Sequence, residues 1–334
     1  MKKLQYILII LVLFAAQQVI AQQHTSKAYS LYQTKEYDSA QFWIDSAIVT
    51  SEKNNSQTWQ LRGLIYRNLE SEKNPNYRKI AINSFLEAKK IDLDHSHEEK
   101  INGYLYNTII RYYNDAVTSM NKSLLETSEK QYNLYKELYI EHIDPSSVFI
   151  EKDIEFYNAL AGACLKLVNS SEGEEKVKNT SMCVNFFEVV LKLNPDQFQP
   201  NFNVGIMYYN QGADLIMNMD PLTPIENIPL IESQAQNSFK KALPYLLKAN
   251  KMQPDRLDVI EGITGCYYGL QDDVNYEMYQ KTLDEKNLPN LLEKHQNNPK
   301  NREVVRELVR IYSTTIKDDE MYKKYASILN NLEE

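Results

Sequence analysis

The sequence predicts an all-α fold, an α-solenoid of about seven antiparallel helix hairpins. First, the 334 residues include only 9 Gly and 11 Pro, too few for the many turns of an all-β chain. Second, a polar junction recurs along the chain and is followed thirteen positions later by a tyrosine. Third, each such segment precedes a second amphipathic run whose apolar residues recur at intervals of four and three, which places them on one helical face.

The N-terminus has the pattern of a signal peptide. Two lysines precede an uncharged apolar run over residues 6–16, and small residues stand at Val19 and Ala21, as signal peptidase requires. We therefore expect a signal peptide over residues 1–21, cleavage after Ala21, and an exported protein, periplasmic or extracellular. An uncleaved membrane anchor is the alternative, but the apolar run is shorter than the roughly 20 residues that a spanning helix needs.

The mature chain is expected to be acidic. Loss of the two N-terminal lysines leaves 35 basic and 45 acidic side chains, a net charge of -10. Such a charge argues against nucleic acid as a partner, because phosphates are bound by basic surfaces. No later segment has the length and hydrophobicity of a membrane span, so we expect no integral membrane segment after signal cleavage.

The first helix of each predicted hairpin follows a junction. Counting thirteen residues from Leu93, Pro195, Pro254 and Pro299 gives Tyr106, Tyr208, Tyr267 and Tyr312. Three positions before these tyrosines stand Gly103, Gly205, Thr264 and Val309, and the segment 59–66 has the same form. A small residue at a helix crossing allows close approach, and a tyrosine one turn later fills the adjacent space.

The second helices carry a small-large-small stripe. The triplets are Ala40/Ile44/Ala47, Ala81/Phe85/Ala88, Cys183/Phe187/Val190, Ala242/Leu246/Ala249 and, with bulkier residues, Met321/Tyr325/Ile328. Prolines at 145, 195, 254 and 299 are expected to separate the hairpins, because proline is not tolerated in a helix interior. After Pro145 the tyrosine rule fails, and the best first-helix match is 157–164. Over 101–124 an apolar stripe predicts an extended helix.

These patterns resemble the tetratricopeptide repeat family. Its helix-pair consensus is matched at Trp59, Gly63, Tyr66, Ala81, Phe85 and Ala88, and again at Gly205, Tyr208, Ala242, Ala249 and Pro254. Arg62 stands where leucine is usual, and the junctions are 52, 50, 59 and 45 residues apart instead of the family's 34. The resemblance covers most of residues 24–331 and implies one tetratricopeptide-like superhelical domain over 22–334, with insertions.

In this family the ligand usually lies along the concave surface formed by the first helices. The register places the following residues there: Arg67, Asn68, Tyr104, Asn107, Phe202, Tyr209, Asn210, Tyr268, Arg306 and Arg310. Asn and Arg hydrogen-bond a peptide backbone or carboxylate, and Tyr adds rigid contact area. The resemblance therefore implies a protein or peptide partner; the alternative is that these are ordinary exposed helix residues.

The three cysteines, Cys164, Cys183 and Cys266, fit no metal-binding spacing. We interpret them as small buried hydrophobes, with a Cys164–Cys183 disulfide as the alternative.

The segment 92–99 combines two histidines with carboxylates, a zinc-ligand composition. Its position at a junction favours a solvated loop instead, so we predict no metal and no cofactor.

The insertion 217–231 places apolar residues on a segment that contains Pro221, Pro224 and Pro229. A partner-binding flap is one interpretation; we favour the other, in which the segment folds back over its own hairpin and covers apolar surface.

No phosphate-binding loop, zinc-protease motif or nucleophile elbow occurs. The leading hypothesis is therefore a non-catalytic exported scaffold that mediates protein-protein or protein-peptide interaction in the bacterial cell envelope. The alternative is a small-molecule or glycan-binding component of an envelope uptake system, which a closed apolar pocket would favour. An enzyme is the third hypothesis, and convergent acid and base side chains in a cleft would support it.

Overall fold

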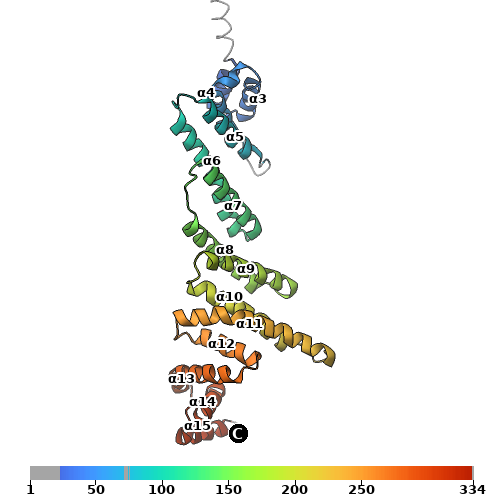
Figure 1. The fold of residues 1–334 in the computed structure, drawn as a ribbon, viewed down its shortest axis with the longest axis vertical. Helices are drawn as coiled ribbons and strands as arrows, with labels where there is room; N and C mark the ends of the chain where they lie inside the picture. The colour runs from blue at the N-terminus through green and yellow to red at the C-terminus, as the bar shows by residue number, and fades with distance from the viewer. Residues whose placement is uncertain (1–22, 71–73, 75, 333–334) are drawn as a thin grey trace, which may run out of the picture. The chain divides into compact units, whose positions relative to one another are not determined.

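The computed structural model describes residues 23–70, 74 and 76–332, and these residues form 14 α-helices and no strand. Successive helices pair into seven antiparallel hairpins (Figure 1). The pairs are α2 (Gln23–Gln33) with α3 (Tyr37–Ala47), α4 (Ser56–Leu69) with α5 (Asn76–Ile91), α6 (Glu98–Asn121) with α7 (Leu125–His142), α8 (Ile150–Ser170) with α9 (Gly173–Leu193), α10 (Phe198–Met217) with α11 (Ile228–Met252), α12 (Leu257–Gly269) with α13 (Asp273–Asn297), and α14 (Arg302–Thr314) with α15 (Asp319–Asn331). The predicted all-α fold of about seven hairpins is confirmed for the described residues.

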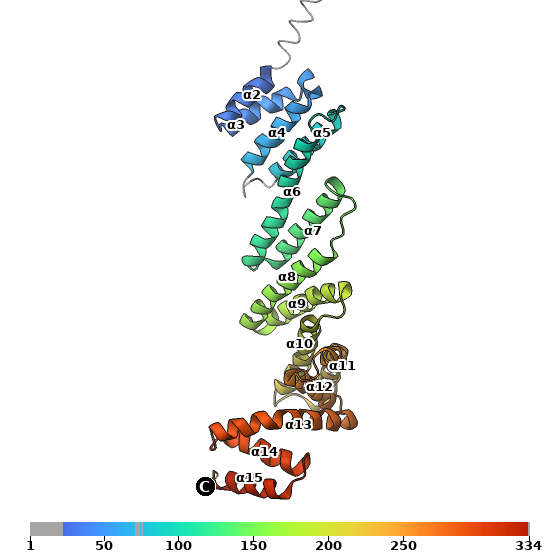
Figure 2. The ribbon, with the colours of Figure 1, turned by 90° about the vertical axis from the view of Figure 1, so that its left-hand side faces the viewer.

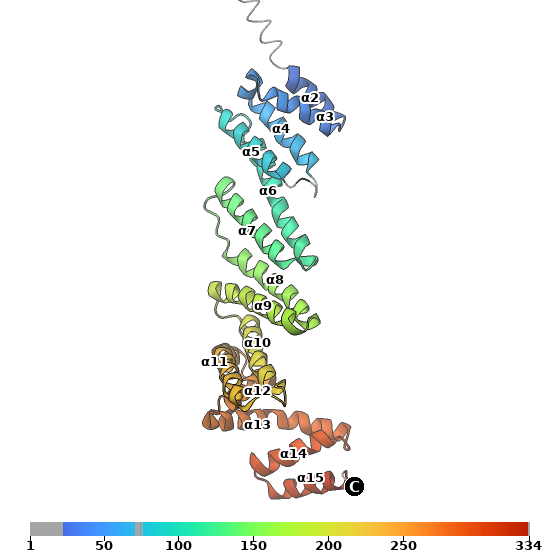
Figure 3. The same ribbon diagram turned by 90° about the vertical axis from the view of Figure 1, so that its right-hand side faces the viewer.

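The chain divides into two compact units, Met1–Phe149 and Ile150–Glu334. The first contains the hairpins from α2 to α7 (Figure 2), and the second those from α8 to α15 (Figure 3). The proposed signal peptide, residues 1–21, lies outside the described residues, and a single domain over 22–334 stays a prediction. No described helix combines the length and hydrophobicity needed to cross a bilayer.

The helix boundaries follow the predicted junctions. The second helices α7, α9, α11 and α13 each end two or three residues before a proline, at positions 145, 195, 254 and 299. Side-chain caps then start several helices, because an Asn or Asp oxygen accepts one of the free amides of the first turn. The capping residues are Asn55, Asp272, Asn301 and Asp318.

The predicted crossing is observed in the α4–α5 hairpin. A methyl group added at Gly63 would lie 2.3 Å from Cε1 of Phe85, far closer than non-bonded carbon atoms approach one another. Phe85 itself is fully buried, as are Ala81 and Ala88 on either side of it. The glycine therefore provides the space that the phenylalanine ring of the partner helix occupies.

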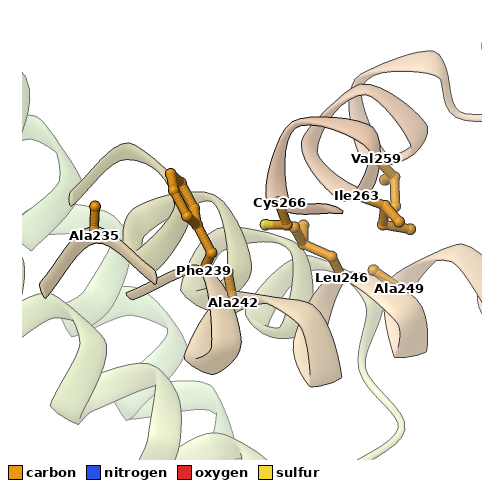
Figure 4. Packing of buried hydrophobic residues seen from close by; sticks show 8 residues of the cluster. All are labelled: Ala235, Phe239, Ala242, Leu246, Ala249, Val259, Ile263 and Cys266. Carbon is orange, nitrogen blue, oxygen red and sulfur yellow. The ribbon is translucent and has the colours of Figure 1, made fainter. Parts of the chain in front are cut away.

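The α10–α11 hairpin repeats this arrangement with an aliphatic side chain. A methyl group at Gly205 would lie 2.6 Å from Cγ of Leu246 and 3.2 Å from its backbone nitrogen. Figure 4 shows Leu246 between Ala242 and Ala249 on α11, close to the α12 residues Val259, Ile263 and Cys266. Leu246 thus joins the core of its own hairpin to that of the next.

The crossing predicted in α6 is wrong. A methyl group at Gly103 would meet no atom within 4 Å, and Tyr106 is 43% exposed. After Pro195, Pro254 and Pro299 the next helix starts three residues later, whereas α6 starts five residues after Leu93. Two extra residues rotate the helix by about 200°, so that Leu105 and Thr108 take the buried positions.

The remaining first-helix tyrosines pack against aromatic side chains of the following helix. Tyr208 stacks on Tyr245 at 6.3 Å, Tyr267 on Tyr279 at 5.6 Å and Tyr312 on Tyr325 at 5.6 Å between ring centroids. In α8 the shifted match is confirmed, because Tyr157, Ala161 and Cys164 are all buried.

Arg62, the departure from the family consensus, links three helices. Its Nε donates to Asp45 Oδ1 of α3 at 2.8 Å, and its Nη1 donates to Ser84 Oγ of α5 at 2.8 Å. The guanidinium lies over the Tyr66 ring, 4.7 Å from its centroid, and the Tyr66 hydroxyl donates to Asp45 Oδ2 at 2.6 Å.

Trp59, half-buried at the start of α4, donates from Nε1 to the carbonyl of Lys53 at 2.7 Å.

The three cysteines are buried free thiols, as the preferred interpretation predicted. Cys164 Sγ contacts the Asn179 carbonyl at 3.4 Å, and Cys183 Sγ contacts the Ala161 carbonyl at 3.5 Å. Burial raises the pKa of the Cys266 thiol to about 12. That thiol is therefore protonated at neutral pH.

We predict that Gly205→Leu lowers the free energy of unfolding by about 1–3 kcal/mol or more, because the new side chain overlaps Leu246. The matched control is Gly103→Leu, which makes the same change where the helix surface is open. The control should be neutral or slightly stabilising, because leucine is the better helix former by almost 1 kcal/mol. Urea denaturation monitored by circular dichroism measures both; equal losses would contradict the crossing.

Candidate partner-binding grooves

The first helices of unit 1 line one cavity of about 460 Å³, which we call the Tyr104 groove. Helix α2 contacts α4, and α4 contacts α6, so that three consecutive first helices present side chains to the same space. The lining includes Ser26 and Tyr29 of α2, Gln57 and Gln60 of α4, and Lys100 and Tyr104 of α6. It is rich in hydroxyl and amide groups and contains no carboxylate among the described residues.

Tyr104 is held between cations and an aromatic side chain. Its ring lies 5.4 Å from that of Phe85, while the Arg67 guanidinium and the Lys100 ammonium are 5.6 Å and 5.8 Å from its centroid. Both charges thus sit within cation–π distance of the tyrosine. Partial burial, followed by repulsion from Arg111, lowers the pKa of Arg67 below its ordinary value.

Two predicted asparagines lie nearby on these helices without lining the groove. Asn68 is exposed and its Nδ2 donates to the Leu64 carbonyl at 2.8 Å, while Asn107 is exposed on α6. The structure therefore brings Arg67 and Tyr104 together and leaves the two asparagines on the neighbouring surface.

A second cavity of about 550 Å³ lies in unit 2 between α10, α11 and α12, and we call it the Tyr209 groove. Tyr209 of α10 and Tyr268 of α12, both predicted from the register, line it together. Tyr209 is half-buried against Phe239 of α11, with 5.9 Å between the ring centroids, and burial raises its pKa. Tyr268 is 70% exposed, so the groove is open to solvent at this side.

The other predicted residues of α10 differ in their surroundings. Phe202 stacks on Phe198 with ring planes 7° apart, and the Arg256 guanidinium lies 5.6 Å from its centroid. Asn210 follows Tyr209 directly in the sequence and is exposed, but it does not line the Tyr209 groove. Phe202 is therefore partly buried by packing between α10 and the start of α12.

The two predicted arginines of α14, Arg306 and Arg310, line neither groove. Arg310 donates from Nη1 and Nη2 to the two carboxylate oxygens of Asp284 in α13, at 2.9 and 2.7 Å, and from Nε and Nη2 to Glu307. Asp284 is buried, whereas Arg306 is exposed. Arg310 thus has a structural ion pair, and whether it also binds a partner stays a prediction.

The Asp284 carboxylate also accepts hydrogen bonds from Gln280 Nε2 and Thr315 Oγ1. Burial acts to raise the pKa of Asp284, but the hydrogen bonds from Arg310, Thr315 and Gln280 outweigh it and lower that pKa below 3.8. The carboxylate is ionised at neutral pH.

The insertion does not cover apolar surface in the way we favoured from the sequence. Its side chains Met217, Leu222, Ile225 and Leu230 are 82%, 88%, 84% and 62% exposed. Met219, Ile228 and Ile231 of the same segment are partly buried. The insertion therefore adds exposed apolar area beside the α10–α11 hairpin, and Met217 contributes to the Tyr209 groove.

Residues 92–97 of the predicted segment form a junction loop, and Glu98 and Glu99 begin α6. Asp92 Oδ2 accepts from the His97 backbone amide at 2.8 Å, and Asp92 Oδ1 lies 3.1 Å from His97 Nδ1. Burial opposes ionisation, but these bonds and one from Ser96 lower the pKa of Asp92. Among the described residues no group of three or more His, Cys, Asp or Glu side chains is arranged to hold a metal ion.

Several groove residues were missed from the sequence. Tyr29 and Gln57 of the Tyr104 groove, and Glu232 and Asp273 of the Tyr209 groove, lie at helix starts or on a hairpin with no clear repeat register. Only Tyr29 could have been found from the sequence, because it lies on a first helix, as the predicted groove residues do. Glu232 and Asp273 carry no such signal, because they lie near the starts of second helices, outside the first-helix register.

No family model and no curated protein matches this chain. Several solved structures match. One, titled as a functional characterisation of Pseudomonas aeruginosa pilF, is 10% identical and has a TM-score of 0.30; the match covers 93% of this chain and 99% of that chain. Yeast Tom70 matches with 14% identity, 95% and 77% coverage and a TM-score of 0.25. The P58(IPK) TPR domain matches with 10% identity, 93% and 98% coverage and a TM-score of 0.23. With TM-scores this low, the repeat architecture rests on the helix packing described above.

We predict that Arg310→Ala lowers the free energy of unfolding at pH 7 by about 2 kcal/mol, because the buried Asp284 carboxylate loses its charged donor. Glu307→Gln, which removes only an exposed partner of Arg310, should cost no more than about 0.5 kcal/mol. Chemical denaturation at several pH values measures both.

The pH dependence has a definite sign. The pKa of Asp284 is lower in the folded chain than its ordinary 3.8, so the pair stabilises the fold above that pH and its contribution is lost as the pH falls through the folded pKa. The difference between Arg310→Ala and the natural chain should therefore shrink in acid. A difference that is constant from pH 7 to pH 2 would contradict this role.

Proposed function

We propose that this chain is a non-catalytic scaffold that binds a protein or peptide partner through grooves formed by its helix hairpins. The observation that carries the proposal is the Tyr104 groove, where three consecutive first helices share one cavity lined by hydroxyl, amide and aromatic side chains. An extended peptide requires such a lining, because its backbone needs hydrogen-bond partners at regular intervals. Tyr29, 54% exposed, offers rigid contact area at low entropic cost.

We propose further that the mature chain acts in the bacterial cell envelope, at the periplasm or cell surface. The support is the signal-peptide pattern of residues 1–21. Small-molecule or glycan binding is the weaker alternative, because both grooves have strongly exposed rims, at Tyr29 and Tyr268, where a small ligand is usually enclosed.

Selection of displayed random peptides on purified residues 22–334 tests the proposal. Peptides that bind the Tyr104 groove should lose at least roughly tenfold in affinity on Tyr29→Ala, about 1.4 kcal/mol. The control is Phe42→Ala, which removes another exposed aromatic side chain, 66% exposed, from the second helix α3; it should change nothing. Failure to select any peptide, or equal losses from both variants, would argue against a groove on the first helices.

A further inference from the structure

The acidity of the protein lies in one of its two units. Residues 150–334 contain 28 acidic and 20 basic side chains, a net charge of -8, which equals the net charge of the entire sequence. Residues 1–149 contain 17 acidic and 17 basic side chains, and without the two N-terminal lysines residues 22–149 carry a net charge of only -2. A cationic partner is therefore attracted to unit 2 before any specific contact forms.

The Tyr209 groove concentrates this charge beside aromatic rings. Glu232 of α11 and Asp273 of α13 line it, and the lining contains no Lys or Arg among the described residues. Both carboxylates are exposed, and neither forms an ion pair or a side-chain hydrogen bond with another described residue. The groove thus presents two uncompensated negative charges to a ligand.

The floor of the groove is aromatic because two glycines of α12 allow it. A methyl group at Gly265 would lie 2.6 Å from Cε2 of Tyr209, and one at Gly269 would lie 2.2 Å from Cε2 of Phe239. The two glycines, one turn apart, let the rings of α10 and α11 reach under α12. Tyr268 and Met217, 70% and 82% exposed, form the apolar rim.

We infer that the Tyr209 groove binds a lysine or arginine side chain that is flanked by a large apolar residue in a partner polypeptide. Tyrosine faces attract a cation at short range, and the Glu232 and Asp273 carboxylates supply its counter-charge. The exposed Met217 and Ile216 side chains offer contact area to the apolar neighbour. This inference rests on the proposed function and specifies which chemistry the second groove selects.

The test uses random peptides displayed on phage and selected on residues 22–334. Isolates that lose binding on Tyr268→Ala should be enriched in Lys or Arg next to a large apolar residue. Replacing that cation by glutamine should weaken each isolate at least roughly tenfold, the effect of a charged contact in an interface hot spot. Isolates that depend on Tyr268 but show no such enrichment would overturn the inference.

Charge reversal separates the groove from the general field of unit 2. Glu232→Lys with Asp273→Lys should abolish binding of the cationic isolates. The matched control, Glu293→Lys with Glu320→Lys, makes the same charge change at two exposed positions outside the groove and should retain most of the affinity. If both double variants weaken binding equally, the groove does not select the cation.

The outcomes also distinguish this inference from the proposed function. Peptides that depend on Tyr29 alone, with none that depends on Tyr268, would overturn the inference and leave the scaffold proposal standing. If no peptide binds either groove, both fail.

Discussion

The structure depends on contacts in which a glycine of one helix faces a large side chain of the next. Two such contacts lie within hairpins, Gly63 against Phe85 and Gly205 against Leu246. A methyl group added at these glycines would lie 2.3 Å from Phe85 and 2.6 Å from Leu246. Alanines at the positions four before and three after the large residue keep the neighbouring turns close. The same arrangement between hairpins, at Gly265 and Gly269, fixes the aromatic floor of the Tyr209 groove. Helix packing and groove chemistry therefore share one physical cause.

The hairpins and their boundaries could be predicted because their signals are local. Proline disfavours a helix interior, and an apolar residue every three or four positions is buried along one helix face. The register of a helix after a junction was not predictable where the junction is longer, since α6 and α8 start five residues after Leu93 and Pro145. In α6 the two extra residues turned Gly103 and Tyr106 out of the interface. The lengths of α11 and α13, which continue through Pro244 and Pro289, were not predictable either.

The candidate sites were predictable only in part. Tyr104, Tyr209 and Tyr268 line cavities, and that these cavities bind a partner stays a prediction. Arg310 was assigned to the same surface, but its partner Asp284 is 26 residues away in sequence and buried. A long-range ion pair of this kind leaves no local pattern. The same applies to Asp45, which joins Arg62 to Tyr66 from a different helix.

A double-mutant cycle between Gly63 and Phe85 tests the central claim most directly. Gly63→Ala places a methyl group where the Phe85 ring lies, so it should destabilise the natural chain but cost little when Phe85→Ala has already emptied that space. The account predicts that the double variant is more stable than the sum of the single losses by about 1 kcal/mol or more, within the range of directly contacting residues. Losses that simply add would show that the crossing does not depend on this contact.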